Sequence, residues 1–531
     1  MKNKVLDCTL RDGGYVNDWG FGEKNIKKII EKLVEANIDI IECGFLSNKN
    51  KFNKDVTIFD DIKGIRSYLP KTKKDNLFVC MINYGEYELD ELPINDNKSI
   101  QGIRIAFHKK DMVGALEYCK ALKAKGYKIF LQPMVSLSYT DDEFIKLIKA
   151  SNKINPYAFY IVDSFGAMNG KDIKHLFKLV DCSLNKNIHI GFHSHNNIQM
   201  SFSNTQTLFN LKTKRNLIID SSVFGMGRGA GNLNTEIFIE YLNEYHKSNY
   251  KLKPLLEIID QILANIYINN YWGYSLPYYI SAKNNCHPNY ATYLDEKNTL
   301  NIENINDILK KIEKHKKNVF DNNYIQELYD KYQEKSVQNK EDINQLRKIF
   351  KNKTILIIAP GKSISLEKKK IKNVMSQKNT ITISVNFLPN DFSCDYVFIS
   401  NKRRYKELIN KSQLNLIITS NITPPANNCF VVDYSDLTND VSCIEDNSTM
   451  MLIKLLIELK VENIKLAGLD GYSHELYENF VDKNMAFIKK PLIMDDMNNG
   501  MTNMLNIFSK DINIEFVTFP RYVKLLPKEK G

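Results

Sequence analysis

The stretch Lys4-Val-Leu-Asp-Cys-Thr-Leu-Arg-Asp-Gly-Gly-Tyr15 decides how the first half of the chain is interpreted. Its apolar part, Val5–Leu10, is typical of a buried strand. Arg11 and Asp12 follow directly, and Gly13-Gly14 then turn the chain. Parallel barrels place their chemistry at the carboxyl ends of their strands, so this pair of charges is a candidate for catalysis.

Seven further apolar runs of strand length follow, and amphipathic stretches separate most of them. The first such helix is expected at Glu23–Ala36, from the spacing of its isoleucines and leucines. The expected strands are Asp39–Phe45, Leu77–Ile82, Gly102–Phe107, Lys128–Met134, Ala158–Val162, Ile188–His193 and Leu217–Val223. This alternation favours a parallel sheet, and eight units in ~225 residues fit an α/β fold of the TIM (β/α)8 barrel type. An open doubly wound sheet is the alternative, but only a closed sheet lets one site use the polar residues at most strand ends.

The rest of the chain indicates two more regions. We expect a barrel over residues 1–253, a helical extension and linker over 254–350, and a doubly wound Rossmann-like domain over 351–531. The polar segment Lys310–Arg347 is interpreted as helical spacer. In the last region we expect strands at Ile355–Ala359, Thr380–Asn386, Tyr396–Ser400, Leu416–Ser420, Cys429–Val432 and Ile464–Gly468, with a helix at Ser448–Lys460.

Composition narrows the class of protein. The 531 residues are 43% hydrophobic, enough for full cores, and the net charge of +11 comes from scattered lysines, which favours a solvated surface over a nucleic-acid partner. There is no signal-peptide pattern and no apolar run near the ~20 residues of a membrane span. The nine cysteines show no CxxC pair, and Cys8, Cys43 and Cys80 are interpreted as buried free thiols of a cytoplasmic protein.

Two histidines with a shared direction predict a metal site. His193-Ser-His195 comes at the end of an expected strand, where alternate residues point the same way. Asp12 can add a carboxylate, since strand ends meet around a barrel rim. Two imidazoles and a carboxylate suit a catalytic divalent metal, although solvated loop histidines are the simpler alternative. The glycine-rich segment Gly225–Gly231 lets the backbone approach a ligand, and Asn232 is a further candidate oxygen ligand.

These pieces together resemble the DRE-type metal-dependent lyases, the HMG-CoA lyase-like or pyruvate carboxyltransferase-like superfamily. The resemblance covers residues 1 to about 290 and is nearest in kind to 4-hydroxy-2-oxovalerate aldolase. The matching pieces are Leu10-Arg-Asp-Gly13, Ile41-Glu-Cys-Gly-Phe45, His193-Ser-His-Asn196 and Gly229-Ala-Gly-Asn232. It implies Asp12, His193 and His195 as ligands of Mn²⁺ or Mg²⁺, with Zn²⁺ or Co²⁺ as alternatives, and it implies Arg11 and Glu42 as a companion pair.

Other site residues are less determined by the sequence. Gln132, Asp163 and Ser164 are candidate substrate contacts or merely satisfied polar residues at strand ends. The related aldolases carry a histidine base three residues after the metal aspartate, where this chain has Tyr15, so the base is in doubt. A free phenol has a pKa of ~10 and would need activation. His287 and Tyr290 are further candidates for the base or for substrate binding, against a purely structural loop around Pro288.

The second α/β region resembles bacterial sialyltransferase-like and pterin-pyrophosphokinase-like Rossmann domains over about residues 353–475. The turn after its first strand lacks the spacing of a Walker loop. The resemblance implies binding of a nucleotide or nucleotide-sugar near Gly361, Ser363, Asn386 and Asp470. A fold retained for assembly or for holding a substrate is the equal alternative.

We therefore expect a metal-dependent carbon–carbon lyase or aldolase acting on a 2-oxo acid with an aldehyde or sugar partner. The pairing with a sugar- or nucleotide-binding domain suggests the biosynthesis of a sugar acid or surface polysaccharide. The alternatives are an acyl-CoA-dependent condensing acyltransferase on the same barrel, and a glycosyl- or nucleotidyltransferase carried by the C-terminal domain. We also expect a homo-oligomer.

Overall fold

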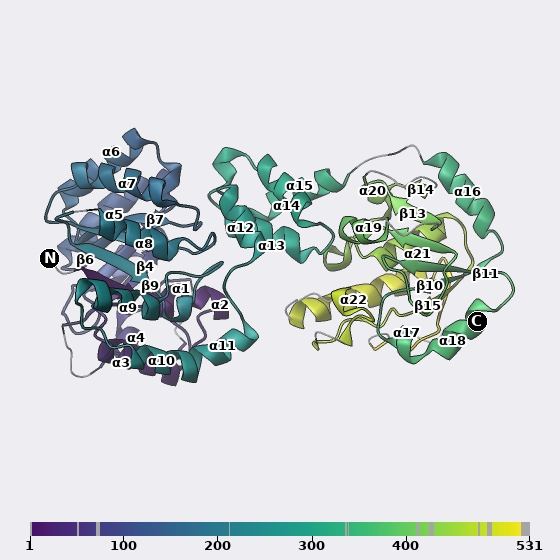
Figure 1. The fold of residues 1–531 in the computed structure, drawn as a ribbon, viewed down its shortest axis with the longest axis horizontal. Coiled ribbons are helices and arrows are strands. Elements are labelled where there is room, and N and C mark those ends of the chain that lie inside the picture. The colour runs from purple at the N-terminus through teal and green to yellow at the C-terminus, as the bar shows by residue number, and fades with distance from the viewer. Residues whose placement is uncertain are drawn as a thin grey trace. The chain divides into compact units, whose positions relative to one another are not determined.

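Eight parallel strands close into a barrel in the N-terminal part of the computed structural model, which confirms the predicted α/β barrel (Figure 1). The described residues are 3–49, 53–70, 75–211, 213–334, 337, 339–409, 414–423, 429–475, 478–485 and 491–521. The barrel strands are β1 (Lys4–Asp7), β2 (Ile40–Leu46), β4 (Leu77–Asn83), β5 (Gly102–Phe107), β6 (Lys128–Pro133), β7 (Ala158–Asp163), β8 (His189–Ser194) and β9 (Leu217–Ser221). Strand β1 pairs with both β2 and β9, which closes the sheet, and the short β3 (Ile58–Phe59) adds to β2.

Helices follow the strands as the alternating pattern predicted. They are α3 (Glu23–Glu35), α4 (Ile62–Arg66), α5 (Met112–Ala124), α6 (Asp141–Ile154), α7 (Gly170–Ser183), α8 (Ser201–Asn210) and α9 (Thr235–His246). In α3 the predicted apolar positions, from Ile26 to Val34, are the buried ones. None of the helices in the described ranges is both long and apolar enough to cross a membrane.

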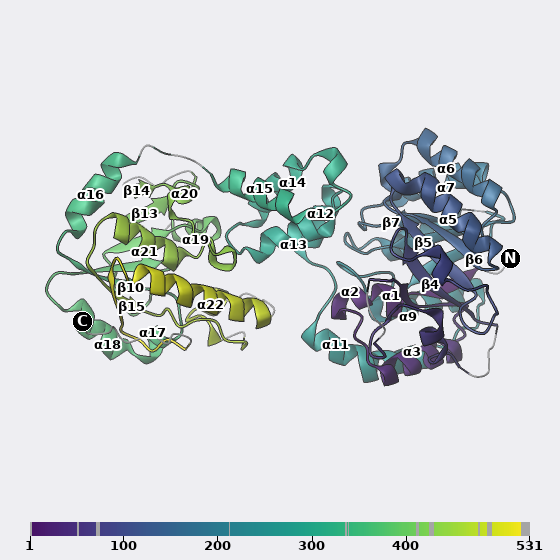
Figure 2. The same ribbon diagram turned by 180° about the vertical axis from the view of Figure 1, so that it is seen from behind.

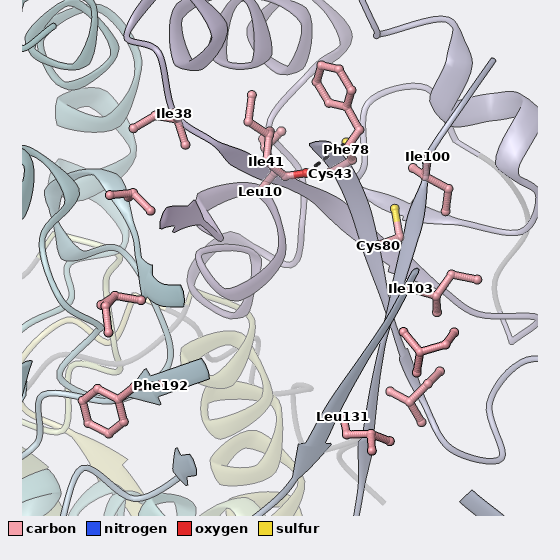
Figure 3. Packing of buried hydrophobic residues seen from close by; sticks show 14 of the residues in the cluster. Leu10, Ile38, Ile41, Cys43, Phe78, Cys80, Ile100, Ile103, Leu131 and Phe192 are labelled. Atoms are coloured by element: carbon pink, nitrogen blue, oxygen red, sulfur yellow. Dashed lines mark hydrogen bonds between the residues drawn. The ribbon is translucent and has the colours of Figure 1, made fainter. Parts of the chain in front are cut away.

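Both faces of the barrel strands are buried, which is why they read as continuous apolar runs. Figure 3 shows part of the outer apolar cluster, including Ile41, Phe78 and Phe192. A separate cluster that includes Leu6, Ile40 and Phe130 comes from alternate positions of the same strands. Cys8, Cys43 and Cys80 are buried free thiols, as predicted.

One prediction about the first strand is wrong. The expected strand Val5–Leu10 ends at Asp7, and Thr9–Asp12 forms a helical turn, α1, followed by α2 (Gly14–Asn17). The turn forms because the Asp7 carboxylate accepts the backbone N–H of Thr9 at 3.0 Å. The Cys8 carbonyl then accepts the N–H groups of Arg11 and Asp12 at 3.1 and 2.8 Å. Arg11 and Asp12 therefore lie on a turn beyond the strand end.

The chain divides by its contacts into two compact units. Unit 1 is Met1–Ala291 with Glu313–Phe320, and unit 2 is Thr292–Ile312 with Asp321–Gly531. Unit 1 continues after α9 with α10 (Lys253–Ile258), a π-helical turn (Ile259–Leu263), α11 (Ala264–Asn269) and α12 (Leu276–Lys283), and α13 (Pro288–Glu296) spans the division. The boundaries at residues 253 and 350 that the sequence suggests stay predictions.

Unit 2 contains a second parallel sheet in the order β14-β13-β12-β11-β10-β15-β16. Figure 2 labels four of these strands, β13, β14, β10 and β15, from behind. Its strands are β10 (Thr354–Ile358), β11 (Thr380–Val385), β12 (Tyr396–Ile399), β13 (Leu416–Thr419), β14 (Cys429–Val432), β15 (Asn463–Ala467) and β16 (Asn513–Phe516). The sequence interpretation did not include β16. The chain winds away from β10 in one direction and returns to β15 on its other side, so the topological switch point lies between these two strands.

The helices of unit 2 include the segment that the sequence suggests as a spacer. They are α14 (Ile302–Lys311), α15 (Asn322–Gln333), α16 (Lys340–Phe350), α17 (Ser363–Leu366), α18 (Lys368–Met375), α19 (Lys402–Leu408), α20 (Tyr434–Leu437), α21 (Ser448–Glu458) and α22 (Pro491–Phe508). Ile343, Leu346 and Phe350 of α16 lie in the main apolar core of this unit. Within this segment α15 and most of α16 are helical, and α16 packs as part of the unit.

Candidate active site

The carboxyl end of β1 carries the charged pair that the sequence analysis singled out. Arg11 and Asp12 are almost fully buried, and Arg11 NH1 lies 3.0 Å from Asp12 Oδ1. Arg11 Nε donates to Glu42 Oε2 of β2 at 2.9 Å. A Cβ on Gly14 would lie 2.0 Å from Trp19, whose indole Nε1 donates to the Arg11 carbonyl at 2.8 Å. Glycine at this position thus lets the indole pack against the turn and fix it.

The predicted metal residues converge on one carboxylate. The Nε2 atoms of His193 and His195 lie 3.6 and 3.8 Å from Asp12 Oδ2. Asn232 donates its Nδ2 to the same oxygen at 2.6 Å. Cys8 joins this group, since it offers its sulfur within 4.8 Å of the ligand atoms of Asp12 and His193. The sequence analysis treated Cys8 only as a core thiol.

Two further buried charged residues, Asp220 and Arg104, contact the cluster, and neither is among the site residues expected from the sequence. Asp220 Oδ2 of β9 lies 2.9 Å from His193 Nδ1. Arg104 of β5 donates through NH1 to Glu42 Oε2 at 2.7 Å and through NH2 to Asp220. The available signal was a single charge inside each of two apolar strands. Such a charge in a strand buried on both faces needs a partner, and the barrel provides it.

The surroundings fix the direction of both imidazole rings. The carboxylate of Asp220 and the carbonyl of Arg228, 3.2 Å from His195 Nδ1, can only accept, so each Nδ1 donates a hydrogen bond and each Nε2 faces Asp12. Burial lowers the pKa of His195 to about 3, although Asp12 opposes the shift. Burial raises the pKa of Asp12, but the charges of Arg11 and other neighbours outweigh it and hold this pKa below its usual range.

This donor set fits a divalent metal. It combines a carboxylate, two imidazole Nε2 atoms that face it, and the Asn232 Oδ1, a buried oxygen with no hydrogen-bond partner among the described residues. The Asp220–His193 hydrogen bond is the carboxylate–histidine contact that orients metal-ligating histidines. Asp12, His193, His195 and Asn232 are therefore the residues that would hold the ion, which the chemistry of the set does not identify further.

Tyr15, Arg228 and His287 lie near the cluster. The Arg228 guanidinium lies 5.6 Å from the centre of the Tyr15 ring, and its NH1 is 3.5 Å from His287 Nε2. Tyr15 is 40% exposed, yet desolvation of its phenol raises its pKa, against the opposing charge of Arg228. Tyr15 is thus protonated at neutral pH and lacks the activation that a base would need. Burial lowers the pKa of His287 to about 2, so this imidazole is neutral.

The structure does not bring Tyr290 into this group. Its side chain is fully buried, and its hydroxyl lies 2.9 and 2.8 Å from the carbonyl oxygens of Lys316 and Val319, to which it donates. These bonds tie the start of α13 to the segment Glu313–Phe320 of the same unit. The geometry favours a structural role for Tyr290.

The three candidate substrate contacts differ in how their polar groups are used. Asp163 accepts the backbone N–H groups of Ala167 and Met168 at 2.9 and 3.0 Å, and burial raises its pKa to about 7. Ser164 Oγ accepts the N–H of Val135 at 2.9 Å. Gln132 is buried at the end of β6, and its Nε2 has no partner among the described residues. Of the three, Gln132 has the group best able to bind a substrate.

In unit 2, three of the four candidate nucleotide-binding residues come together at the switch point. The backbone N–H of Ser363 donates to Asp470 Oδ2 at 2.7 Å, and the Ser363 hydroxyl also donates to Asp470. A Cβ on Gly361 would lie 2.6 Å from Asp470 Cγ. Asn386, after β11, instead donates to Ser448 Oγ at 2.5 Å. Nucleotide binding by these residues stays a prediction.

The barrel unit is similar to several known proteins. Residues 2–262 match the model of the family described as HMGL-like. A 4-hydroxy-2-oxovalerate aldolase from Bacillus thuringiensis (strain Al Hakam) is 25% identical over 266 residues, which are 49% of this chain and 76% of the relative. Another, from Pseudoalteromonas translucida (strain TAC 125), is 26% identical over 244 residues, 46% of this chain and 70% of the relative. The crystal structure of the HMG-CoA lyase from Bacillus subtilis is 16% identical with a TM-score of 0.43, covering 50% of this chain and 94% of that one.

Proposed function

We propose that the barrel, whose residues 2–262 match the HMGL-like family model, is a metal-dependent aldolase or lyase that makes or breaks a C–C bond next to the carbonyl of a 2-oxo acid. The observation that carries the proposal is the buried convergence of His193 and His195 on Asp12 beside the Arg11–Glu42 pair. Packing alone gives no reason to bury so many charges together.

The role proposed for each residue follows from its polar atoms that have no hydrogen-bond partner among the described residues. A divalent ion supplies Lewis-acid stabilisation of the enolate of a 2-oxo acid. Arg11 is held by Asp12 and Glu42, and its NH2 is buried with no hydrogen-bond partner among the described residues. This group adds a fixed positive charge and a donor where an oxyanion develops. Glu42 orients Arg11, and Gln132 offers a second free N–H to the substrate.

Tyr15 has the protonation state of an acid. In the condensing direction, the enolate carbon attacks the aldehyde carbon and the aldehyde oxygen gains a proton. A phenol with a raised pKa can donate that proton from the rim of the site. In the cleaving direction the same group, as the phenolate, would take the proton back.

Two alternatives come from the sequence. An acyl-CoA-dependent condensing enzyme would use the same barrel residues, whereas a glycosyl- or nucleotidyltransferase would depend on unit 2 and tolerate loss of Asp12. The wider proposal of sugar-acid or surface-polysaccharide biosynthesis rests on the pairing of the two units in one chain.

The test compares two products. The purified protein, loaded in turn with Mn²⁺ and Mg²⁺, is mixed with pyruvate and a panel of aldehydes, and 4-hydroxy-2-oxo acids are detected by mass spectrometry. Parallel reactions contain acetyl-CoA, and free thiol is measured. We expect hydroxy-oxo acid formation without thiol release. Thiol release alone would establish the acyltransferase, and neither product would contradict both barrel functions.

A further inference from the structure

Arg228 differs from the other arginines of the site in its partners. Arg11 pairs with Asp12 and Glu42, and Arg104 with Glu42 and Asp220. Among the described residues, no carboxylate forms an ion pair with Arg228. Its Nε is buried without a hydrogen-bond partner, and its NH2 donates to the Ser164 carbonyl at 3.0 Å. The guanidinium therefore keeps an unneutralised charge and a free N–H.

The location of this charge connects it to the reaction. The Arg228 carbonyl accepts from His195 at 3.2 Å, so the residue belongs to the backbone that flanks the metal cluster. Its side chain lies over the Tyr15 ring and reaches His287. Its charge also acts on the pKa values of Asp12, Tyr15 and His195. The guanidinium thus contacts residues at the rim of the cluster.

The groups that contact the Arg228 side chain supply no compensating charge. The imidazole of His287 is neutral, Tyr15 is a protonated phenol, and Ser164 contributes a carbonyl. A partly buried guanidinium with a free N–H, held by neutral groups, suits an oxyanion of a ligand, for which arginine offers a planar fork of donors. The 2-oxo acid already has Arg11 and the metal residues, whereas the second substrate has no cationic partner assigned to it.

We propose that Arg228 recognises a negatively charged group, a carboxylate or a phosphate, on the aldehyde partner of the 2-oxo acid. This inference rests on the proposed function and names the class of its second substrate: an acidic aldehyde. Arg228 is a specificity residue that contacts substrate away from the bond that forms. The backbone contact with His195 is independent of the side chain, so substitution leaves it in place.

The experiment measures selectivity between matched aldehydes with the metal-loaded full chain. Succinic semialdehyde is compared with butanal, and glyceraldehyde 3-phosphate with glyceraldehyde, each with pyruvate. We expect the wild type to have a kcat/KM at least tenfold higher for one acidic aldehyde than for its neutral match, and the pair that shows the difference identifies carboxylate or phosphate. Loss of a charge-assisted bond is expected to lower kcat/KM for that aldehyde about 10- to 100-fold in Arg228→Gln.

Two further variants separate recognition from general damage. Arg228→Lys keeps the charge without the fork and should give an intermediate selectivity ratio. Lys110→Gln removes an exposed positive charge beyond the end of β5 and should keep the wild-type ratio. Thermal melting accompanies each assay. Should Arg228→Gln fail to fold, Arg228→Lys and the wild-type ratios still decide the matter.

The outcomes are distinguishable from failure of the proposed function. A wild type that condenses acidic and neutral aldehydes equally well would overturn the inference, as would an unchanged ratio in Arg228→Gln. A KM for pyruvate that rises in Arg228→Gln while the aldehyde ratio stays fixed would assign the residue to the 2-oxo acid and also overturn it. Absence of any condensation by the wild type would instead count against the proposed function.

Discussion

The carboxyl ends of the two parallel sheets carry similar polar residues, but the two sets are used differently. In unit 2, Ser363, Asp470 and Thr518 satisfy one another: Ser363 bonds to Asp470, and its hydroxyl lies 2.8 Å from Thr518 Oγ1. In the barrel, buried atoms of Arg11, Gln132 and Asn232 have no hydrogen-bond partner among the described residues. Because leaving a buried polar group unpaired costs about 1–3 kcal/mol, the barrel cluster indicates a site that a ligand completes. In unit 2, Ser363, Asp470 and Thr518 bond to one another, which indicates a structural role for this polar group.

The largest effect is expected from a substitution at the centre of the barrel cluster. Asp12→Asn removes the carboxylate on which both histidines converge, and we expect metal-dependent exchange of the pyruvate C3 protons to fall at least a thousandfold, about 4 kcal/mol. Proton NMR in deuterated water measures it. The matched control is Asp7→Asn, a buried carboxylate on the same segment that bonds to Thr9 and Thr235, which should retain exchange. Equal loss in both variants would assign the effect to folding.

The second prediction concerns the charges behind the cluster. Arg104→Met leaves Glu42 and Asp220 buried with one fewer cation, and we expect unfolding free energy to fall by about 3 kcal/mol in urea denaturation. Arg66→Met, at an exposed arginine, should stay within about 0.5 kcal/mol of the wild type. A stable Arg104→Met protein would show that the buried charges relax without this arginine.

A third prediction concerns the pH dependence of stability that the buried carboxylate of Asp7 causes. Burial raises the pKa of Asp7 to about 6, so the folded state binds its proton more tightly than the unfolded state. The resulting stability is fully present below pH 4 and is lost as the pH rises through 6, a change of about 3 kcal/mol. Asp7→Asn should remove this contribution, which urea titrations at pH 4 and 7 would detect. A pH dependence identical to that of the wild type would contradict the assignment.

A smaller effect is expected from the residue that orients His193. Asp220→Asn weakens the His193 contact, and we expect metal affinity to fall about 10- to 100-fold, about 1.4–2.8 kcal/mol. Calorimetric titration with Mn²⁺ measures the affinity, and circular dichroism checks the fold. Unchanged affinity in a folded variant would show that His193 is not a ligand.

The smallest effect is expected for the polar group of Ser363, Asp470 and Thr518 in unit 2. Thr518→Val removes the hydroxyl that accepts the Gly468 N–H at 2.9 Å and bonds to Ser363. We expect a loss of about 1 kcal/mol in the unfolding of this unit, with no loss of pyruvate exchange. A loss of exchange would mean that the two units act on one reaction.

Much of this organisation could be predicted from the sequence, because it depends on local pattern. Alternating apolar runs predicted the barrel and most of the second sheet, and the His193-Ser-His195 spacing on an extended segment predicted two imidazoles with one direction. The turn at Thr9–Asp12 was missed because Asp7 ends the strand through a side-chain bond that apolar periodicity does not report. Arg104 and Asp220 were missed because their roles depend on partners from distant strands that only closure of the barrel brings together.

Deuterium exchange at the pyruvate C3 position shows whether the barrel cluster holds a metal that acts on a 2-oxo acid. The wild type is assayed as purified, after chelation, and after addition of Mn²⁺ or Mg²⁺, beside His195→Ala. We expect exchange that disappears on chelation, returns with metal, and is absent in His195→Ala. Exchange that persists after metal removal, or metal-loaded protein that exchanges no 2-oxo acid, would contradict metal-dependent chemistry on a 2-oxo acid at this cluster.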